Sequence, residues 1–203
     1  MPAHSARAAP RARREAPALA ARPLRPYAAS SVAQLREALR GALAARDGLA
    51  GAECIHEMSM RGEMSLNVER ALGELWQAAA GSIPEWLPMR HVEWLPLAYE
   101  VAGHCRAAAR GRSNLYLVLL DYADSPRGPY GVYVGMTHYT AAERFDQHKA
   151  GIRAAGSVLK RGLEVLTGPV AHLQRLSRAE ASRIESELAE ALRAQGLLVH
   201  GGH

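Results

Sequence analysis

The residues best suited to chemistry lie between Tyr130 and Gly151. Tyr133 falls in a β-prone run, and Arg144 and His148 follow it four positions apart, on one face of a predicted helix. An arginine guanidinium is always charged and can address two phosphate oxygens at once, whereas a histidine titrates near neutral pH and can move a proton. Because a phosphodiester is already anionic, its hydrolysis needs positive charge and a proton acceptor. This combination of residue types therefore predicts a site that cleaves phosphodiesters.

A second tyrosine, Tyr116, lies in the apolar, β-prone run Leu115–Leu120. If this run pairs with the one that contains Tyr133, both hydroxyls come from neighbouring strands and could position or deprotonate the attacking water. A free tyrosine has a pKa of about 10 and is a weak base at neutral pH unless its surroundings lower that pKa. His148 is the other candidate base or relay, and the sequence leaves open which group takes the proton.

The strands that must hold these residues can be placed from local patterns. Leu115–Leu120 and Tyr130–Gly135 are β-prone, and residues 121–129 between them are rich in Asp, Ser, Pro and Gly, which predicts a hairpin with a long tip. A third β-prone run lies at Val170–Leu176. The expected fold is α/β (α+β), with a small three-stranded antiparallel sheet flanked by helices.

Two capping boxes mark where helices begin after the hairpin. In Thr140–Glu143 and in Ser177–Glu180, a hydroxyl and a carboxylate three positions apart can satisfy each other's backbone amides. The first box predicts a helix that begins near Ala141. The second predicts a last helix from about residue 178 to residue 193.

Residues 114–203 resemble a GIY-YIG nuclease domain. Asn114–Tyr116 stands in the place of the Gly-Ile-Tyr element, and Tyr133–Gly135 in that of Tyr-Ile-Gly. Arg144 and His148 reproduce the family's Arg-x-x-x-His/Tyr helix. The resemblance implies an endonuclease that hydrolyses DNA with the help of a divalent metal ion, Mg²⁺ or Mn²⁺.

The resemblance also implies that the terminal helix supplies a metal-binding glutamate. Matching the spacing between that glutamate and the helix end favours Glu185 as the ligand of one hard cation, held mainly by water and phosphate oxygens. Helical periodicity does not separate Glu185 from Glu187, because both border the apolar stripe, whereas Glu190 lies on the opposite side. The predicted catalytic residues are Tyr116, Tyr133, Arg144, His148 and Glu185, of which Glu185 binds the metal.

Two features depart from the family pattern. The two tyrosines are farther apart than in the family, so Tyr122 or Tyr130 could be the first-motif tyrosine, although Tyr116 has the better strand context. The family's late asparagine is missing, and His200 is the nearest residue that could replace it.

Basic residues follow His148 closely and could track a nucleic-acid backbone, with an ordinary solvated surface as the alternative interpretation. At Gly135, the missing side chain lets strand and helix approach closely. The residues predicted to contact nucleic acid are Gly135, Thr137, Lys149, Arg153, Lys160, Arg161 and His200.

The net charge is concentrated at the N-terminus. The chain carries a formal charge of +5, and residues 1–30 account for all of it, with six arginines against Glu15 alone. We expect residues 1–30 to form a disordered basic tail that adds nonspecific attraction for a polyanion, above all nucleic acid.

Residues 31–113 are expected to form a helical region ahead of the nuclease-like domain. Helices are predicted to open near Ser31 and to lie around residues 67–80 and 92–110. No recognition helix or zinc module that could read base edges is evident. A regulatory or protein-binding role is the open alternative for this region.

Composition and spacing argue against several classes of protein. No apolar run is long enough to span a membrane, and two cysteines are too few for a disulfide framework. His56–Met60 has Met60 where a zinc protease needs its second histidine. We expect a cytoplasmic protein whose partner is DNA, and a homodimer is one way to cut both strands. The alternative is a catalytically inactive GIY-YIG-like module that binds nucleic acid or protein.

Overall fold

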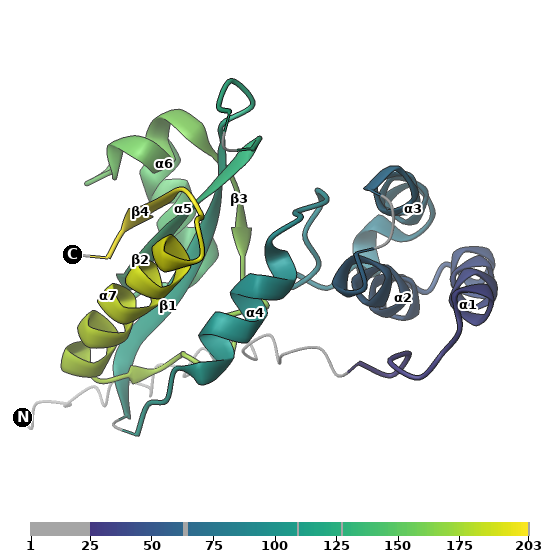
Figure 1. The fold of residues 1–203 in the computed structure, drawn as a ribbon, viewed down its shortest axis with the longest axis horizontal. Helices are drawn as coiled ribbons and strands as arrows, with labels where there is room; N and C mark the ends of the chain where they lie inside the picture. The colour runs from purple at the N-terminus through teal and green to yellow at the C-terminus, as the bar shows by residue number, and fades with distance from the viewer. Residues whose placement is uncertain (1–24, 63–64, 109, 127, 203) are drawn as a thin grey trace, which may run out of the picture.

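The computed structural model of the chain describes residues 25–202 except 63–64, 109 and 127, so most of the predicted basic tail lies outside the described residues. The chain forms a bundle of helices and a sheet that is covered by helices (Figure 1). The bundle consists of α1 (Val32–Ala45), α2 (Gly48–Met60), α3 (Ser65–Ala79) and the 3₁₀ helix η1 (Ala80–Ser82). The second part contains α4 (Leu95–His104), β1 (Arg110–Asp121), β2 (Tyr130–Thr137), α5 (Ala141–Lys149), α6 (Gly156–Arg161), β3 (Gly162–Leu166), α7 (Arg178–Ala194) and β4 (Val199–Gly201).

The mixed α/β fold predicted from the sequence is confirmed, but the sheet has one strand more than expected. Its strand order is β3-β1-β2-β4. β1 runs antiparallel to both β2 and β3, whereas β4 runs parallel to β2. The predicted three-stranded antiparallel sheet is therefore wrong in strand number and in its last pairing. β4 has only 3 residues, too few for an alternating pattern to appear in the sequence.

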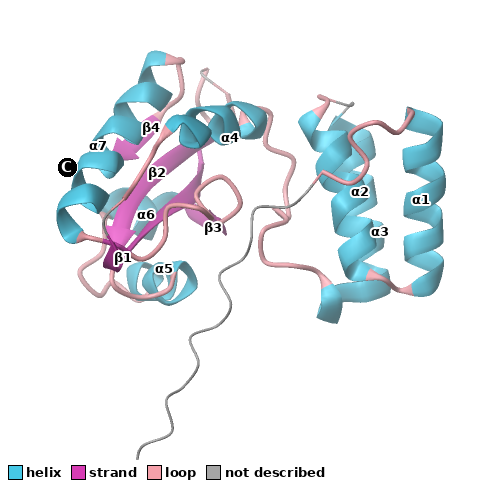
Figure 2. Cartoon of the chain, turned by 90° about the horizontal axis from the view of Figure 1, so that it is seen from below, coloured by secondary structure: helices cyan, strands magenta, loops and turns pink. Residues whose placement is uncertain are grey.

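Helices cover both faces of the sheet (Figure 2). α4 and α7 pack on one face, where inward residues such as Leu117 join the largest apolar core. α5 and α6 pack on the other face, where Tyr116 is buried near Val158. Because both faces of β1 are covered, its side chains are buried without alternation, which explains the continuous apolar run Leu115–Leu120.

Both predicted helix starts are confirmed, in α5 and α7, but the reciprocal pattern of a capping box is present at Thr140 and Glu143, whereas the Glu180 carboxylate bonds to a different backbone amide. The Thr140 hydroxyl accepts the Glu143 amide (3.2 Å), and the Glu143 carboxylate accepts the Thr140 amide (2.9 Å). The Ser177 hydroxyl accepts the Glu180 amide (3.3 Å). The Glu180 carboxylate accepts the Ala108 amide (2.9 Å), and so ties α7 to the segment that precedes β1.

Helix α4 belongs to the core of the sheet and not to the helical bundle. Leu95 is buried in the same cluster as residues of β1 and α7, while α1, α2 and α3 share a separate core. The helix predicted at residues 92–110 ends earlier, at His104, because the chain extends into β1 from Arg110. The border between the two apolar cores thus falls well before residue 113, where the sequence suggested a domain border.

The last residues of the predicted tail are anchored on α2. Arg25 donates two hydrogen bonds to the Glu57 carboxylate (2.9 and 2.8 Å), and Arg61 donates a third (2.7 Å). Arg61 also donates to backbone carbonyls within residues 27–30. Glu57 is 1% exposed, and its pKa is lowered mainly by the hydrogen bonds from Arg25. Residues 25–30 are therefore a structured part of the bundle, where the sequence predicted disorder.

The bundle and the sheet are joined through Glu164 on the edge strand β3. Its carboxylate accepts hydrogen bonds from the Met89 amide (2.9 Å) and from the Arg90 guanidinium (3.2 Å). The Thr167 hydroxyl donates to the Glu85 carbonyl (3.3 Å). These contacts hold the segment that connects the bundle to α4 beside the exposed edge of the sheet.

The predicted strand at Val170–Leu176 does not form, and β3 takes its place in the sheet. Residues 170–176 form mostly turns, with isolated bridges at Leu176. Val170, Leu173 and Leu176 are nonetheless buried. A spacing of three is that of a turn or helix, so the segment was wrongly assigned to a strand.

The longest helix among the described residues, α7, has 17 residues and carries several charged side chains. None of the helices in the described part of the chain is long and apolar enough to cross a membrane.

Candidate active site

Three aromatic rings meet between the sheet and α5, and we call them the aromatic cluster. The ring centroids of Tyr116 on β1 and Tyr133 on β2 are 5.9 Å apart. The ring of His148 on α5 lies 6.2 Å from that of Tyr116 and 5.8 Å from that of Tyr133. Tyr116 and His148 are buried, and Tyr133 is half-buried. The fold thus brings together three residues that the sequence indicated as catalytic.

Gly135 leaves the space that the two tyrosine rings occupy. It pairs with Tyr116 across the hairpin of β1 and β2. A Cβ atom at this position would lie 2.6 Å from Tyr133 Cε1 and 2.7 Å from Tyr116 Oη. The close approach predicted at Gly135 is therefore an approach of tyrosine side chains to the backbone of β2.

Replacing Gly135 with alanine is expected to lower the free energy of unfolding by about 1–3 kcal/mol, because the methyl group overpacks the aromatic cluster. Urea denaturation followed by circular dichroism measures this change. Gly156, at the start of α6, provides a matched control, since nothing lies within 4 Å of a Cβ atom there. Gly156→Ala should leave the stability unchanged or slightly raised. Equal unfolding midpoints for the two variants would contradict the packing described at Gly135.

The hydrogen bonds of His148 determine its tautomer. Nδ1 accepts a hydrogen bond from the Ala155 amide (2.9 Å), so the neutral ring carries its proton on Nε2. Nε2 lies 2.8 Å from the Tyr116 hydroxyl and therefore donates to its oxygen. Burial and, to a lesser extent, the charge of Arg144 lower the pKa of His148 to about 4, so the ring is neutral at pH 7. With both nitrogens engaged, His148 orients Tyr116 and is not free to take a proton from water.

Both tyrosines of the cluster are protonated at neutral pH. Burial is the largest cause that raises the pKa of Tyr116 and of Tyr133 above the ordinary value. Tyr133 raises the pKa of Tyr116 further, whereas Arg144 lowers it. Because His148 donates to the Tyr116 oxygen, the Tyr116 proton can point to another acceptor. The hydroxyls are therefore better suited to hold a water molecule or a ligand oxygen than to deprotonate water.

Arg144 lies on α5 beside the loop that follows this helix. Its guanidinium donates to the carbonyls of Ile152 (3.2 Å) and Arg153 (2.8 Å) and to the Gln147 side chain (3.1 Å). Arg144 and Thr137 line a cavity of about 450 Å³ at the end of β2. Arg144 has no carboxylate partner among the described residues, so its charge is available to an anion in that cavity.

Glu185 supplies a buried carboxylate from α7. It is 7% exposed, and within the described residues it forms no salt bridge. Burial raises its pKa to about 7, although a hydrogen bond with the Gly202 backbone opposes this shift. The charge of Glu185 also raises the pKa of Tyr133, so the carboxylate acts electrostatically on one member of the aromatic cluster. Glu187, the alternative left open by the sequence, is exposed and pairs with Arg183 (2.6 Å).

The chemistry of the Glu185 carboxylate suits a hard divalent cation. A buried carboxylate without a cationic partner is stabilised in its charged form by a bound cation, and oxygen is the ligand type that Mg²⁺ and Mn²⁺ prefer. No group of three or more His, Cys, Asp or Glu side chains that could hold a metal ion occurs in the described part of the chain. A cation at Glu185 would therefore take its other ligands from water and phosphate, as Mg²⁺ usually does.

Tyr122 and His200 form a separate pair near the hairpin tip. His200 on β4 is the register partner of Tyr133, but its ring stacks on that of Tyr122, with centroids 5.9 Å apart, and its Nε2 lies 2.5 Å from the Tyr122 hydroxyl. Arg161 lies over the Tyr122 ring at 4.3 Å. Tyr130 packs against the core on the opposite face of the sheet. Neither alternative tyrosine belongs to the aromatic cluster, and His200 is engaged with Tyr122.

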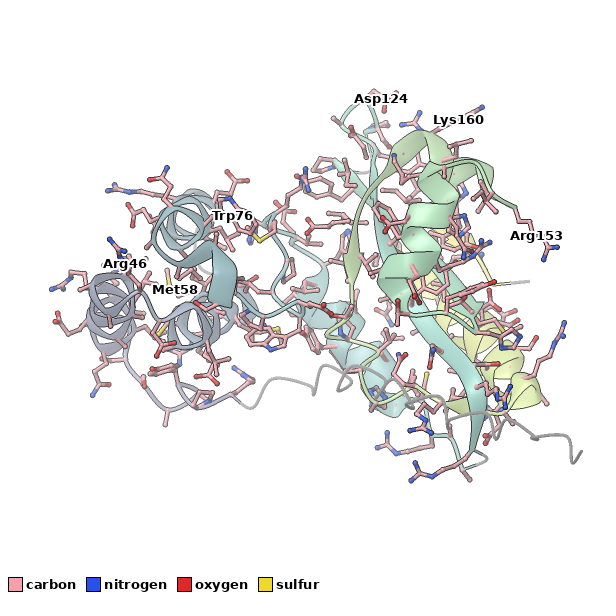
Figure 3. The ribbon with its side chains drawn as sticks, turned by 180° about the vertical axis from the view of Figure 1, so that it is seen from behind. Arg46, Met58, Trp76, Asp124, Arg153 and Lys160 are labelled. Carbon is pink, nitrogen blue, oxygen red and sulfur yellow. The ribbon has the colours of Figure 1, made fainter. Side chains whose placement is uncertain are left out.

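Of the four basic residues after His148 that were predicted to contact nucleic acid, two are held by contacts within the protein and two project into solvent. Lys149 donates to two backbone carbonyls (3.4 and 3.1 Å), and Arg161 pairs with Asp124 (3.2 Å). The side chains of Arg153 and Lys160 project from the surface around α5 and α6 (Figure 3). Of the predicted basic residues, these two are best placed to meet a phosphate backbone.

Several residues that line the cavity beside Arg144 were not among those predicted from the sequence. They come from separate segments and include Ser113, Tyr139 and Arg178. No spacing in the sequence relates Ser113 or Arg178 to Arg144, because the pairing of β1 with β2 and the docking of α7 bring them close, whereas Tyr139 lies just before α5 in the sequence. An exposed tyrosine in the turn after Tyr-Val-Gly is the one signal that could have drawn attention to this place.

No protein-family model, curated protein or solved structure matches the chain.

Proposed function

We propose that the protein is an endonuclease that hydrolyses DNA phosphodiester bonds with the help of a divalent metal ion. One observation carries the proposal. The rings of Tyr116, Tyr133 and His148 meet between the sheet and α5, Arg144 lies on the same helix as His148, and Arg144 and Glu185 both act electrostatically on the tyrosines. Together they could supply fixed hydrogen-bond donors, a permanent cation and a carboxylate, as phosphodiester hydrolysis requires.

In the proposed reaction, water attacks phosphorus and gives up a proton to the solvent, while the bond to the leaving oxygen breaks and that oxygen takes up a proton from the solvent. Negative charge builds up on the phosphate in the transition state. Arg144 binds a non-bridging oxygen and offsets this charge. Tyr116 and Tyr133 donate hydrogen bonds that position the water or the phosphate, while His148 orients Tyr116. When bound at Glu185, Mg²⁺ or Mn²⁺ would supply further positive charge and make water a better nucleophile.

DNA is the proposed partner because the surface beside the site offers exposed cations. Arg153 follows α5, Lys160 lies on α6, and both are exposed (Figure 3). In the sequence, residues 1–30 carry the entire net charge of the chain. Such charges attract nucleic acid without regard to sequence. One site per chain cuts one strand at a time, so cleavage of both strands would take a homodimer or two successive nicks.

A catalytically inactive module that binds nucleic acid or protein is the second candidate. It is favoured by the state of the acid–base groups. His148 has both ring nitrogens engaged, and the hydroxyls of Tyr116 and Tyr133 have raised pKa values. Under this alternative, Arg144 and the exposed basic residues would bind a phosphate backbone without cutting it.

Cleavage of supercoiled plasmid and of single-stranded oligonucleotide in Mg²⁺, Mn²⁺ or EDTA tests the proposal. We expect nicks or fragments with either metal and none in EDTA, because without a cation at Glu185 the site lacks the positive charge that makes water a better nucleophile. A gel shift in the same samples reports binding. Binding without cleavage under any metal would refute the endonuclease and support the inactive module.

A further inference from the structure

The cavity beside Arg144 has the features of a nucleotide-binding pocket. Its volume of about 450 Å³ is within the range of small-molecule sites. It lies where the end of β2, the loop after α5 and the first turn of α7 come together. We call it the flanking pocket, and the lining residues that matter below are Ser113, Thr137, Tyr139, Arg144, Arg153 and Arg178.

The flanking pocket is electropositive. Arg144, Arg153 and Arg178 line it, and no carboxylate is among its described lining residues. Arg153 and Arg178 are exposed and form no salt bridge with any residue that the structure describes. Arg178 also lies in the first turn of α7, where the helix dipole adds positive potential. Free guanidinium groups in this setting suit a phosphate group.

Tyr139 offers an aromatic face to the same pocket. Its amide donates to the Thr137 hydroxyl (3.1 Å), and its carbonyl accepts a hydrogen bond from the Asn114 side chain (2.9 Å), so its backbone is held on both sides. The residue is nevertheless 52% exposed. An open aromatic ring on a fixed backbone is suited to stack on a nucleobase, because little conformational freedom is lost on binding.

The backbone at Arg153 links the flanking pocket to the active site. Arg153 has a φ of 46°, in the left-handed region that residues other than glycine seldom adopt. In this conformation its carbonyl accepts a hydrogen bond from Arg144 (2.8 Å), while its own guanidinium stays exposed. Residues held in uncommon backbone conformations are enriched at ligand-binding sites, and Arg153 is the positive-φ arginine that lines this pocket. The loop therefore positions Arg144 and presents Arg153 to the pocket at the same time.

We propose that the flanking pocket takes one unpaired nucleotide next to the cleaved bond, with its base on Tyr139 and its phosphate between Arg153 and Arg178. This inference rests on the proposed endonuclease, because Arg144, which would hold the cleaved phosphate, lines the same pocket. A base inside a duplex is stacked on both sides and shows only its edges, so it cannot lie on Tyr139. The substrate class is therefore DNA with a single-stranded segment at the cleavage site.

Fluorescence anisotropy in EDTA tests the pocket without requiring cleavage. The probes, of equal length, are oligothymidine, its duplex with oligodeoxyadenosine, and a sugar-phosphate oligomer that lacks bases. We expect the wild type to bind oligothymidine about 5- to 150-fold more tightly than the base-free oligomer, the range that one base stack implies, and also more tightly than the duplex. Tyr139→Ala should weaken oligothymidine binding by about 5- to 150-fold, the range that loss of one base stack implies. The same variant should bind the base-free oligomer as the wild type does, and Tyr139→Phe should bind oligothymidine normally.

Arg178→Ala should weaken binding of oligothymidine and of the base-free oligomer by a similar factor, because a phosphate contact does not depend on the base. It should also reduce the salt dependence by roughly 0.7 in the log–log slope, as expected for one lost contact to a single strand. Arg183→Ala is the matched control. It removes an equal charge from the same helix, but from a surface pair with Glu187, and should change neither quantity.

Several outcomes would overturn the proposal. They are equal affinity of Tyr139→Ala and the wild type for oligothymidine, equal affinity of the wild type for duplex and oligothymidine, and failure to bind any probe. The endonuclease fails by a different result, the absence of cleavage in Mg²⁺ and Mn²⁺. That result leaves the binding measurements, and the pocket they test, unaffected.

Discussion

Replacing Arg144 with alanine is expected to lower the rate constant of DNA cleavage, kcat, by about 100- to 1000-fold. The guanidinium is proposed to offset charge that builds up on the phosphate only in the transition state, so the loss should appear in kcat more than in KM. Hydrogen bonds to Gln147, Ile152 and Arg153 hold the guanidinium in one position, so it is already in place when the transition state forms. Cleavage of oligothymidine in Mg²⁺ under single-turnover conditions measures the effect on the chemical step.

Two further variants separate the charge of Arg144 from its structural contacts. Arg144→Lys keeps the charge but loses the two-pronged geometry, and should recover only part of the rate. Arg183→Ala removes a charge from an exposed pair with Glu187 and should leave the rate unchanged. Thermal unfolding checks that each variant is folded. A wild-type rate for folded Arg144→Ala would remove Arg144 from the proposed mechanism.

Local patterns predicted the elements around the site because these elements depend on neighbours in the sequence. Turn-forming residues predict the hairpin tip. Thr140 and Glu143, three positions apart, predict the start of α5, where they form the expected reciprocal hydrogen bonds. The edge strands β3 and β4 were missed because they are short, and their pairing depends on contacts with distant strands. A strand was wrongly predicted at Val170–Leu176, because apolar content alone does not distinguish a buried turn from a buried strand.

The candidate site also combines relations that the sequence predicts with contacts that arise only on folding. Helical spacing related Arg144 to His148 correctly, because both lie on α5. The tautomer of His148 could not be predicted, since the Ala155 amide that determines it belongs to the following loop. Nor could periodicity choose between Glu185 and Glu187, which border the same apolar stripe. They differ only in what they meet after folding, a buried environment for the first and a surface ion pair for the second.

Replacing Glu185 with glutamine is expected to abolish metal-dependent cleavage and, without metal, to stabilise the fold above pH 7. Burial raises the pKa of Glu185 from its ordinary value of 4.5 to about 7. Between these values the folded protein keeps a proton that the unfolded chain has lost, so the free energy of unfolding falls as pH rises. The loss reaches about 3 kcal/mol above pH 7. Glutamine has no charge to bury and can still accept a hydrogen bond from Gly202, so the variant should not show this loss.

Urea denaturation in EDTA at a series of pH values measures the difference between wild type and Glu185→Gln. The two proteins should be equally stable below the unfolded-state pKa of 4.5 and should diverge as pH rises toward 7. His148 acts in the opposite direction. Its pKa is lowered from 6.5 to about 4, so its contribution makes stability rise with pH between these values. That contribution is present in both proteins and cancels in the difference.

Metal should act on the same carboxylate. Above pH 7, Mg²⁺ or Mn²⁺ should raise the free energy of unfolding of the wild type, because the cation binds ionised Glu185 only in the folded state, and should not affect Glu185→Gln. Since the cation competes with a proton, its apparent affinity should rise about tenfold per pH unit below pH 7 and level off above it. Cleavage by Glu185→Gln at the wild-type rate would exclude Glu185 as the metal ligand. Equal stabilisation of both proteins would locate the cation elsewhere, whereas no stabilisation of either, with DNA binding retained, would favour the module that binds without cutting.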